Sequence, residues 1–187
     1  MAKRAFDLAM ILATAMPILA VCLVVAILVK ATSPGPVLYW SDRVGAHSRI
    51  FRMPKFRTMR TDTPVVATHL LQNPAQWITP IGAFLRSSSL DELPQLLSVL
   101  RGDMSLVGPR PALYNQADLV AARRECGVDA LQPGITGWAQ INGRDELPIP
   151  EKVAYDHEYL KRQSFVFDLR IILLTVVNVL QRKGVSH

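Results

Sequence analysis

The chain has 187 residues, which is enough for one domain with a hydrophobic core but not comfortably for two. Half of the residues are apolar and the net charge is +6, so we expect an anionic partner such as nucleic acid, anionic lipid or a phosphorylated substrate. The two cysteines and four scattered histidines argue against a disulfide framework and against a zinc site.

The first element is an apolar run from Leu8 to Val29, in which only Thr14 and Pro17 are not apolar. A run of this length can span a bilayer as one helix. It is too long for a cleaved signal peptide, which would also need a small-residue cleavage site before the mature domain. Two interpretations remain open: a helix that spans the bilayer, and a re-entrant hairpin that enters and leaves on the same face.

The flanks and the middle of this run favour the re-entrant interpretation. Lys3 and Arg4 precede the run and Lys30 follows it. Basic residues favour the cytoplasmic side of a membrane, so this pattern is consistent with both ends of the run lying in the cytoplasm. Pro17 lies near the middle, where it removes a backbone donor and predicts a break or kink. We therefore predict a re-entrant helix-break-helix over residues 1–31, followed by a cytoplasmic domain over 32–187. A spanning helix with a tolerated proline is the alternative.

A turn-rich boundary at residues 32–36 leads into a predicted strand at 37–40. Residues 43–60 carry several arginines and a lysine with no acid, and strand fragments are expected at 50–51 and 55–57. Most of these cations suit a solvated or lipid-facing surface, and a few could bind a diphosphate. A packed connection is expected at 78–85 and a turn at 132–138. Further helices are expected at 69–73, 90–100, 112–127, 150–162 and 165–180, the last as a core or interfacial helix.

Two adjacent carboxylates, Asp91 and Glu92, stand at the expected start of the helix at 90–100. Ser89 and Glu92 match the S-x-x-E capping box, which would place both acids in the first turn, where backbone amides favour the ionised form. An ionised Asp91 could act as a nucleophile or hold a metal ion. Acidic residues are also common in first turns without any catalytic role, so the spacing leaves both interpretations open. Pro94 makes the start of this helix uncertain.

Arg110 lies between Pro109 and Pro111. Each proline fixes its own φ, and Pro111 pushes Arg110 toward extended geometry. The arginine is thereby held at low entropic cost, which suits a bidentate contact with a phosphate. A turn with a surface salt bridge is the simpler explanation for the same residues.

A series of segments in this order resembles the bacterial sugar transferases, the monotopic polyprenol-phosphate phosphoglycosyl transferases, over nearly the whole chain. The segments are KRAFD (3–7), TSPGPV (32–37), RVG (43–45), KFRTM (55–59), RSSSLDELPQ (86–95), GDMSLVGPRP (102–111) and PGITGWAQINGR (133–144). No multi-helix segment precedes the core, so the chain resembles the small form of the family.

The resemblance implies transfer of a sugar-1-phosphate from a UDP-sugar to undecaprenyl phosphate, with release of UMP. Asp91 would be the nucleophile that forms a covalent phosphosugar-aspartate and would contact Mg²⁺, and Glu92 would assist the acceptor or orient the metal site. The residues implied for substrate binding are Lys55, Arg57, Arg86, Pro109, Arg110, Pro111 and Arg144. The lipid-linked product would begin a glycan.

The implied fold is an α/β core, mostly helical with a small sheet, in a monotopic membrane protein with interfacial amphipathic helices. The implied location is the cytoplasmic face of the bacterial inner membrane, with membrane lipids as partners and no nucleic acid. The chain departs from the family at Met16-Pro17, where a serine usually precedes the proline. The alternative function is a non-catalytic, membrane-anchored adaptor whose basic face binds anionic lipid or nucleic acid.

Overall fold

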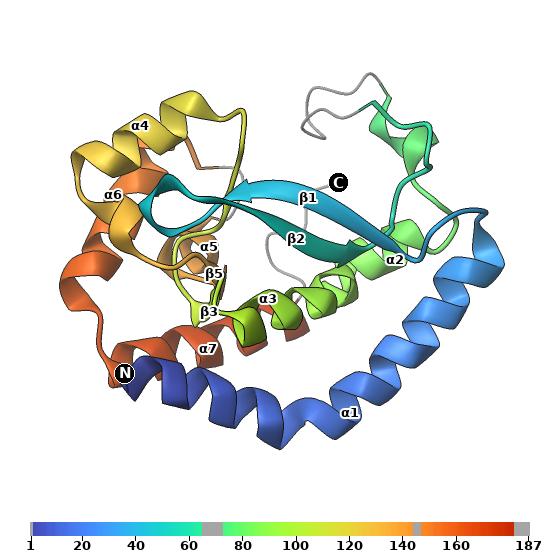
Figure 1. Cartoon of the computed structure of the whole chain (residues 1–187), viewed down its shortest axis with the longest axis horizontal. Coiled ribbons are helices and arrows are strands. Elements are labelled where there is room, and N and C mark those ends of the chain that lie inside the picture. Colours follow the sequence, from blue (N-terminus) through green and yellow to red (C-terminus); the bar gives the residue numbers. More distant parts are fainter. Residues whose placement is uncertain (1, 65–72, 144–146, 182–187) are drawn as a thin grey trace.

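The computed structural model describes residues 2–64, 73–143 and 147–181, which form a mostly helical α/β fold with a small sheet (Figure 1). The predicted fold class is confirmed at this level. The helix expected at 69–73 falls almost entirely outside the described residues, and Arg144 lies outside them.

The main sheet has three strands in the order β2-β1-β4. Strands β1 (Leu38–Val44) and β2 (Ile50–Phe56) pair antiparallel along their full length, and β4 (Ala112–Leu113) pairs antiparallel with the end of β1. The two strand fragments predicted at 50–51 and 55–57 therefore belong to one strand. Pro54 lies inside β2, which is an edge strand, and edge strands tolerate a residue without a backbone donor.

A second, two-stranded sheet is parallel and pairs β3 (Ser105–Val107) with β5 (Gly134–Thr136). Neither strand was predicted, because three residues are too few to show an alternating apolar pattern. Both strands lead directly into segments that the sequence singles out: the Gly-Pro-Arg-Pro turn after β3 and helix α5 (Trp138–Asn142) after β5.

The C-terminal helices agree with the predictions, whereas those in the middle of the chain differ. Helix α7 (Phe165–Leu180) has the predicted bounds and α6 (Ile149–Arg162) begins one residue early. The helix predicted at 112–127 begins later, as α4 (Ala117–Glu125), because β4 takes its first residues. The remaining helical segments are η1 (Ala46–Ser48), η3 (Pro74–Trp77), α2 (Gly82–Ser87), η4 (Leu90–Gln95), α3 (Leu96–Arg101) and η5 (Val128–Ala130).

Helix α1 (Ala2–Thr32) is a single element that extends the predicted apolar run toward the N-terminus. By length and composition it could cross a membrane, and it is the one such helix among the described residues. Figure 1 shows that its axis changes direction about midway, and Pro17 lies inside the helix. The hydroxyl of Thr14 also donates to the carbonyl of Met10 at 2.8 Å. A proline and a back-bonded threonine both bend helices, so the predicted kink is present as a bend within one continuous helix.

Both halves of α1 pack against strand β2, whereas the middle of the helix is exposed. Ile11 belongs to a buried cluster with Met53 of β2. Val25 and Val29 belong to another cluster with Phe56, three residues along the same strand. The exposed large apolar side chains between and around these anchors are Leu12, Met16, Leu19, Val21, Leu23, Val24, Ile27 and Leu28. The helix is therefore docked at two places and leaves an apolar stretch uncovered around its bend.

Arg57, which follows β2, braces the connection between α1 and β1. Its guanidinium donates to the carbonyls of Pro36 and Pro34, both at 2.6 Å, and to the carbonyl and hydroxyl of Ser33, both at 2.9 Å. Only 4% of Arg57 is exposed. This geometry supports a structural role for Arg57 in place of the predicted phosphate contact.

We expect Arg57→Ala to lower the free energy of unfolding by about 3 kcal/mol, because it removes charged hydrogen bonds and leaves buried carbonyls without donors. Urea unfolding in detergent micelles, followed by tryptophan fluorescence, measures the change. Arg60→Ala is the matched control, since Arg60 pairs with Asp62 on the surface and its removal should have little effect. An Arg57→Ala protein as stable as the control would contradict the bracing role.

Candidate active site

Asp91 and Glu92 lie in η4, a short 3-10 helix between α2 and α3. The predicted capping box is wrong: Ser89 adopts left-handed geometry (φ 56°, ψ 15°) and its side chain makes no capping hydrogen bond. Pro94 lies inside η4, and regular α-helix begins only at Leu96. The proline lacks the backbone donor that a longer α-helix would require, so the predicted helix at 90–100 divides into two segments.

Three cations from separate elements surround the two carboxylates. Lys55 of β2 places its Nζ 2.7 Å from Oε1 of Glu92, and Nη2 of Arg110 lies 3.3 Å from the same oxygen. Arg86 of α2 also acts electrostatically on Asp91. Lys55 is 37 residues from Glu92 in the sequence, and the packing of β2 against η4 brings the two side chains together.

The two neighbouring carboxylates have opposite pKa shifts. Burial raises the pKa of Asp91 to about 6, and the charge of Glu92 adds to this shift while Lys55, Arg86 and Arg110 oppose it. Burial would also raise the pKa of Glu92, but the charges of Lys55 and Arg110 and their hydrogen bonds outweigh it and hold that pKa well below its usual range. The expected helix-terminus stabilisation of ionised Asp91 is therefore a wrong prediction, because desolvation dominates in a buried short helix.

Arg86 is held beside Asp91 by the loop that follows β2. Its Nε donates to the hydroxyl of Thr58 at 3.0 Å, and Thr58 is itself buried. The carbonyl of Thr58 accepts a backbone hydrogen bond from Thr79 at 3.0 Å. Sequence reasoning missed Thr58, which directly follows the predicted strand fragment at 55–57 and carries no signal for this contact.

The turn of residues 108–111 that carries Arg110 is held against β5 by backbone hydrogen bonds. The amide of Gly108 donates to the carbonyl of Thr136 at 2.9 Å, and the amide of Gly134 donates to the carbonyl of Pro109 at 2.9 Å. A Cβ atom at Gly108 would lie 2.3 Å from a backbone oxygen, so this close approach requires glycine. Hydrogen bonds to β5 thus fix the backbone of the turn, while the Arg110 side chain contacts Glu92.

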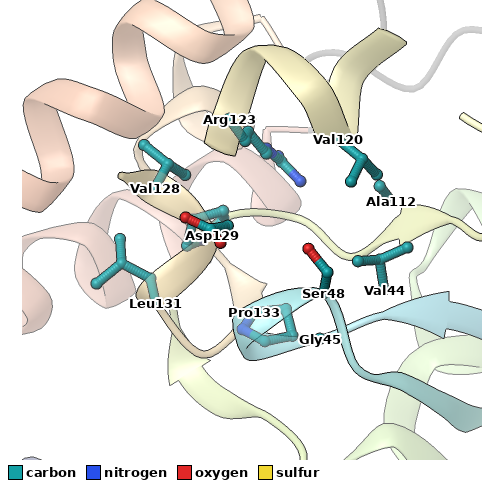
Figure 2. Close-up of a pocket in the computed structure, with 11 residues that line it drawn as sticks. Val44, Gly45, Ser48, Ala112, Val120, Arg123, Val128, Asp129, Leu131 and Pro133 are labelled. Carbon is teal, nitrogen blue, oxygen red and sulfur yellow. The ribbon is translucent and has the colours of Figure 1, made fainter. Parts of the chain in front are cut away.

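A pocket lies behind this turn, lined by Pro109 together with residues of β1, β4, α4 and η5 (Figure 2). Its walls are mostly apolar, including Val44, Val120 and Val128, and Arg123 of α4 is among its polar lining residues. It does not include Asp91 or Glu92. The pocket and the carboxylate pair are therefore separate features connected through the 108–111 turn.

The structure brings together five of the residues predicted for the site: Asp91, Glu92, Lys55, Arg86 and Arg110. Pro109 and Pro111 flank Arg110 as predicted from the chain order. Arg57 is directed to backbone carbonyls of 33–36, and Arg144 lies outside the described residues. Adjacent buried carboxylates with surrounding cations are suited to chemistry on a phosphate, since one carboxylate can attack while cations stabilise the phosphoryl oxygens.

Comparison with known proteins identifies the family of the chain. The profile of the bacterial sugar transferases matches residues 1–182. The chain belongs to the bacterial sugar transferase family. Its relatives include a UDP-glucose:undecaprenyl-phosphate glucose-1-phosphate transferase of Xanthomonas campestris pv. campestris, 44% identical over 86% of the chain. An uncharacterized sugar transferase of Bacillus subtilis, EpsL, is 41% identical over 99% of the chain.

The relatives differ in length. The chain covers 35% of the Xanthomonas transferase but 90% of EpsL. An undecaprenyl-phosphate galactose phosphotransferase of Salmonella typhimurium is 37% identical over 97% of the chain, which covers 41% of that protein. The chain therefore spans about a third of the Xanthomonas relative and nearly all of EpsL.

We expect Asp91→Asn to raise the melting temperature of the metal-free protein at neutral pH, because the substitution removes a buried charge. The folded-state pKa of about 6 lies above the usual 3.8, so the wild type loses stability as pH rises from about 4 to 6 and regains none above. The difference in melting temperature between variant and wild type should therefore grow over that interval and then stay constant. Differential scanning fluorimetry with EDTA measures it, and a difference independent of pH would contradict the raised pKa.

Proposed function

We propose that this protein transfers a sugar-1-phosphate from a UDP-sugar to undecaprenyl phosphate and releases UMP. The observation that carries the proposal is the buried Asp91-Glu92 pair, with Lys55, Arg86 and Arg110 around it. The printed names of the Xanthomonas and Salmonella relatives describe phosphosugar transfer to undecaprenyl phosphate, which supports the same reaction class.

In the first half-reaction, a carboxylate oxygen of Asp91 attacks the β-phosphorus of the UDP-sugar. The bond between this phosphorus and the bridging oxygen breaks, and UMP leaves with that oxygen. A phosphosugar-aspartate remains. The pKa of about 6 supports this role, because Asp91 is mostly ionised at neutral pH while burial keeps its carboxylate poorly solvated and reactive.

In the second half-reaction, a phosphate oxygen of undecaprenyl phosphate attacks the same phosphorus. The bond to Asp91 breaks, the free carboxylate is restored, and the sugar diphosphate lipid leaves. Because each half-reaction uses the same carboxylate, the kinetics are ping-pong. The sugar itself is not specified by the contacts of the carboxylate pair.

Glu92 positions the cations, and the cations stabilise the charge of the diphosphate. The contacts of Glu92 with Lys55 and Arg110 hold both cations beside Asp91 in the absence of substrate. An incoming diphosphate brings oxygens that compete for these donors, and cations placed in advance stabilise its charge without reorganisation. Arg86 approaches from α2 and adds a third positive charge.

We also propose Mg²⁺ as the cofactor. The described residues contain no group of three or more histidine, cysteine, aspartate or glutamate side chains that could hold the ion by themselves. Magnesium at phosphoryl-transfer sites is commonly held by one or two carboxylates together with substrate phosphates, so Asp91 with a bound diphosphate fits the ion. When bound, the ion would neutralise charge on the diphosphate.

We infer that α1 is re-entrant, because both of its halves pack on one seven-residue strand. If α1 crossed a hydrocarbon core of about 30 Å, its two ends would lie on opposite faces of the membrane. Ile11 and Val29 could not then both reach clusters built on β2. The exposed apolar middle around Met16, 83% exposed, suits the lipid side of the bend.

Helix α7 is proposed to lie at the membrane interface beside the start of α1. Phe6 and Phe165 pack edge to face with ring centroids 4.9 Å apart, and Lys3 pairs with Asp168 at 2.5 Å. One face of α7 packs into the core, and the other exposes apolar side chains. The exposed residues are Phe165, Val166, Leu169, Leu173, Val176 and Val177. Such a helix binds in the plane of the interface.

The basic ends of α1 place the protein at the cytoplasmic face of the inner membrane in this proposal. Lys3 and Arg4 at one end and Lys30 at the other satisfy the positive-inside rule only if both ends are cytoplasmic. The catalytic residues, which lie on the body that holds both ends, then face the compartment that supplies UDP-sugars.

For the reaction, we expect wild-type protein incubated with a UDP-sugar labelled in its β-phosphate and Mg²⁺, without lipid acceptor, to retain label on the protein. Asp91→Asn should retain none and should transfer at least 10³-fold more slowly, because an amide is a poor nucleophile. Asp62→Asn, on the surface away from the pair, is the control. Turnover by Asp91→Asn at the wild-type rate would refute the covalent mechanism, and a panel of UDP-sugars in the same assay identifies the donor.

For topology, we expect single cysteines at Ala2 and Thr32, both exposed positions, to be labelled from the same side of the membrane. The background protein carries Cys22→Ala and Cys126→Ala. In intact spheroplasts an impermeant maleimide should label neither site, and permeabilisation should expose both. Labelling of one site in intact spheroplasts would establish a spanning helix.

A further inference from the structure

A buried ion pair lies behind the turn that carries Arg110. Nε and Nη2 of Arg123 on α4 donate to the same carboxylate oxygen of Asp156 on α6, at 2.9 and 2.7 Å. Arg123 is 7% exposed and Asp156 is 1% exposed. The third nitrogen of the guanidinium, Nη1, donates to the backbone carbonyl of Arg110 at 2.9 Å. Through this hydrogen bond the side chains of the pair reach from α4 and α6 to the site turn.

This contact acts on the same residue whose side chain enters the site. The Arg110 carbonyl accepts from Arg123, while the Arg110 guanidinium contacts Glu92 at 3.3 Å. The neighbouring carbonyls have other donors: Pro109 accepts from the amide of Gly134, and Pro111 accepts from Nη1 of Arg43 at 3.2 Å. Three successive carbonyls are thus held by three elements, and Arg123 holds the central one.

Because the local backbone is stiff, the position of the Arg110 carbonyl controls the position of the Arg110 side chain. Prolines on both sides fix φ at 109 and 111 and restrict Arg110, so the turn has few ways to relax without moving as a unit. A shift of the Arg110 carbonyl therefore shifts its Cα and the origin of its side chain. Figure 2 shows the Arg123 side chain extending from α4 at the pocket that Pro109 of the turn also lines.

A contribution to the free energy of unfolding explains the buried Arg123–Asp156 pair less well than a positioning role does. Burying two charges costs desolvation energy that their attraction often fails to recover, and apolar replacements are frequently as stable. Burial raises the pKa of Asp156 even though Arg123 opposes the shift, so the carboxylate carries a net desolvation cost. A rigid planar guanidinium is well suited to connect a carboxylate and a carbonyl at fixed geometry.

We propose that Arg123 and Asp156 are positioning residues for phosphosugar transfer: Asp156 orients Arg123, and Arg123 holds the Arg110 carbonyl so that the Arg110 guanidinium stays at the carboxylate pair. This inference rests on the proposed function, because it takes Arg110 as a ligand of the UDP-sugar diphosphate. Neither residue touches the reacting atoms. Their effect passes through Arg110.

A double-mutant cycle tests this dependence. The single variants are Arg123→Lys, which keeps the charge but loses the fork that bridges both acceptors, and Asp156→Asn, which keeps the shape but loses the charge. We expect each to raise KM for the UDP-sugar and lower kcat/KM about tenfold at saturating undecaprenyl phosphate. In an Arg110→Ala background, the same substitutions should change kcat/KM by less than twofold. The carbonyl of residue 110 remains there, but the guanidinium through which the substitutions act is absent.

Glu158→Gln is the matched control. It lies on the same helix two residues from Asp156, and its carboxylate contacts Arg162 and the Trp138 indole rather than the turn. We expect it to leave KM unchanged in both backgrounds. Melting temperatures of all variants separate loss of fold from loss of positioning.

The outcomes are distinguishable. Effects of Arg123→Lys and Asp156→Asn that add fully to that of Arg110→Ala would show a general structural role and overturn the proposal. Wild-type kinetics in both variants, or loss of the folded state in both, would also overturn it. If Arg110→Ala itself transfers phosphosugar like the wild type, the part assigned to Arg110 in the proposed function fails, whatever the cycle shows.

Discussion

The burial of two adjacent carboxylates is the constraint on which the rest of the structure depends. In a short 3-10 helix, Asp91 is buried and the Glu92 side chain is only 19% exposed, and two neighbouring negative charges with so little solvation would be costly alone. Lys55, Arg86 and Arg110 compensate them, and each comes from a different element. The sheet, α2 and the 108–111 turn must therefore all be in place before the pair can be buried.

Strand β2 connects this site to the long apolar helix α1. Met53 and Phe56 pack with the two halves of α1, and Lys55 between them reaches Glu92. One strand therefore holds both anchors of α1 and one of the site cations. This arrangement suits the proposed function, in which the acceptor is a lipid and the donor is water-soluble.

Local sequence predicted well those features that local forces control. The bounds of α7 follow from a mostly apolar stretch that Asp168, Arg170 and Asn178 interrupt, and the bend of α1 follows from a proline. Predictions failed where a partner distant in sequence decides the outcome. The capping box at Ser89 gave way to a left-handed turn, and the pKa of Asp91 rose through burial. No local pattern contains those neighbours.

By itself, the sequence determined the apolar anchor with basic flanks, the acidic pair, the proline-bounded Arg110 and the family to which these motifs belong, because each is a matter of residue type and order. The tertiary structure alone decided which cations face Asp91 and Glu92, that both halves of α1 dock on one strand, and that Arg123 reaches the Arg110 carbonyl. These relations depend on packing between residues far apart in the chain, where side-chain distance and burial, rather than spacing in sequence, set the energies.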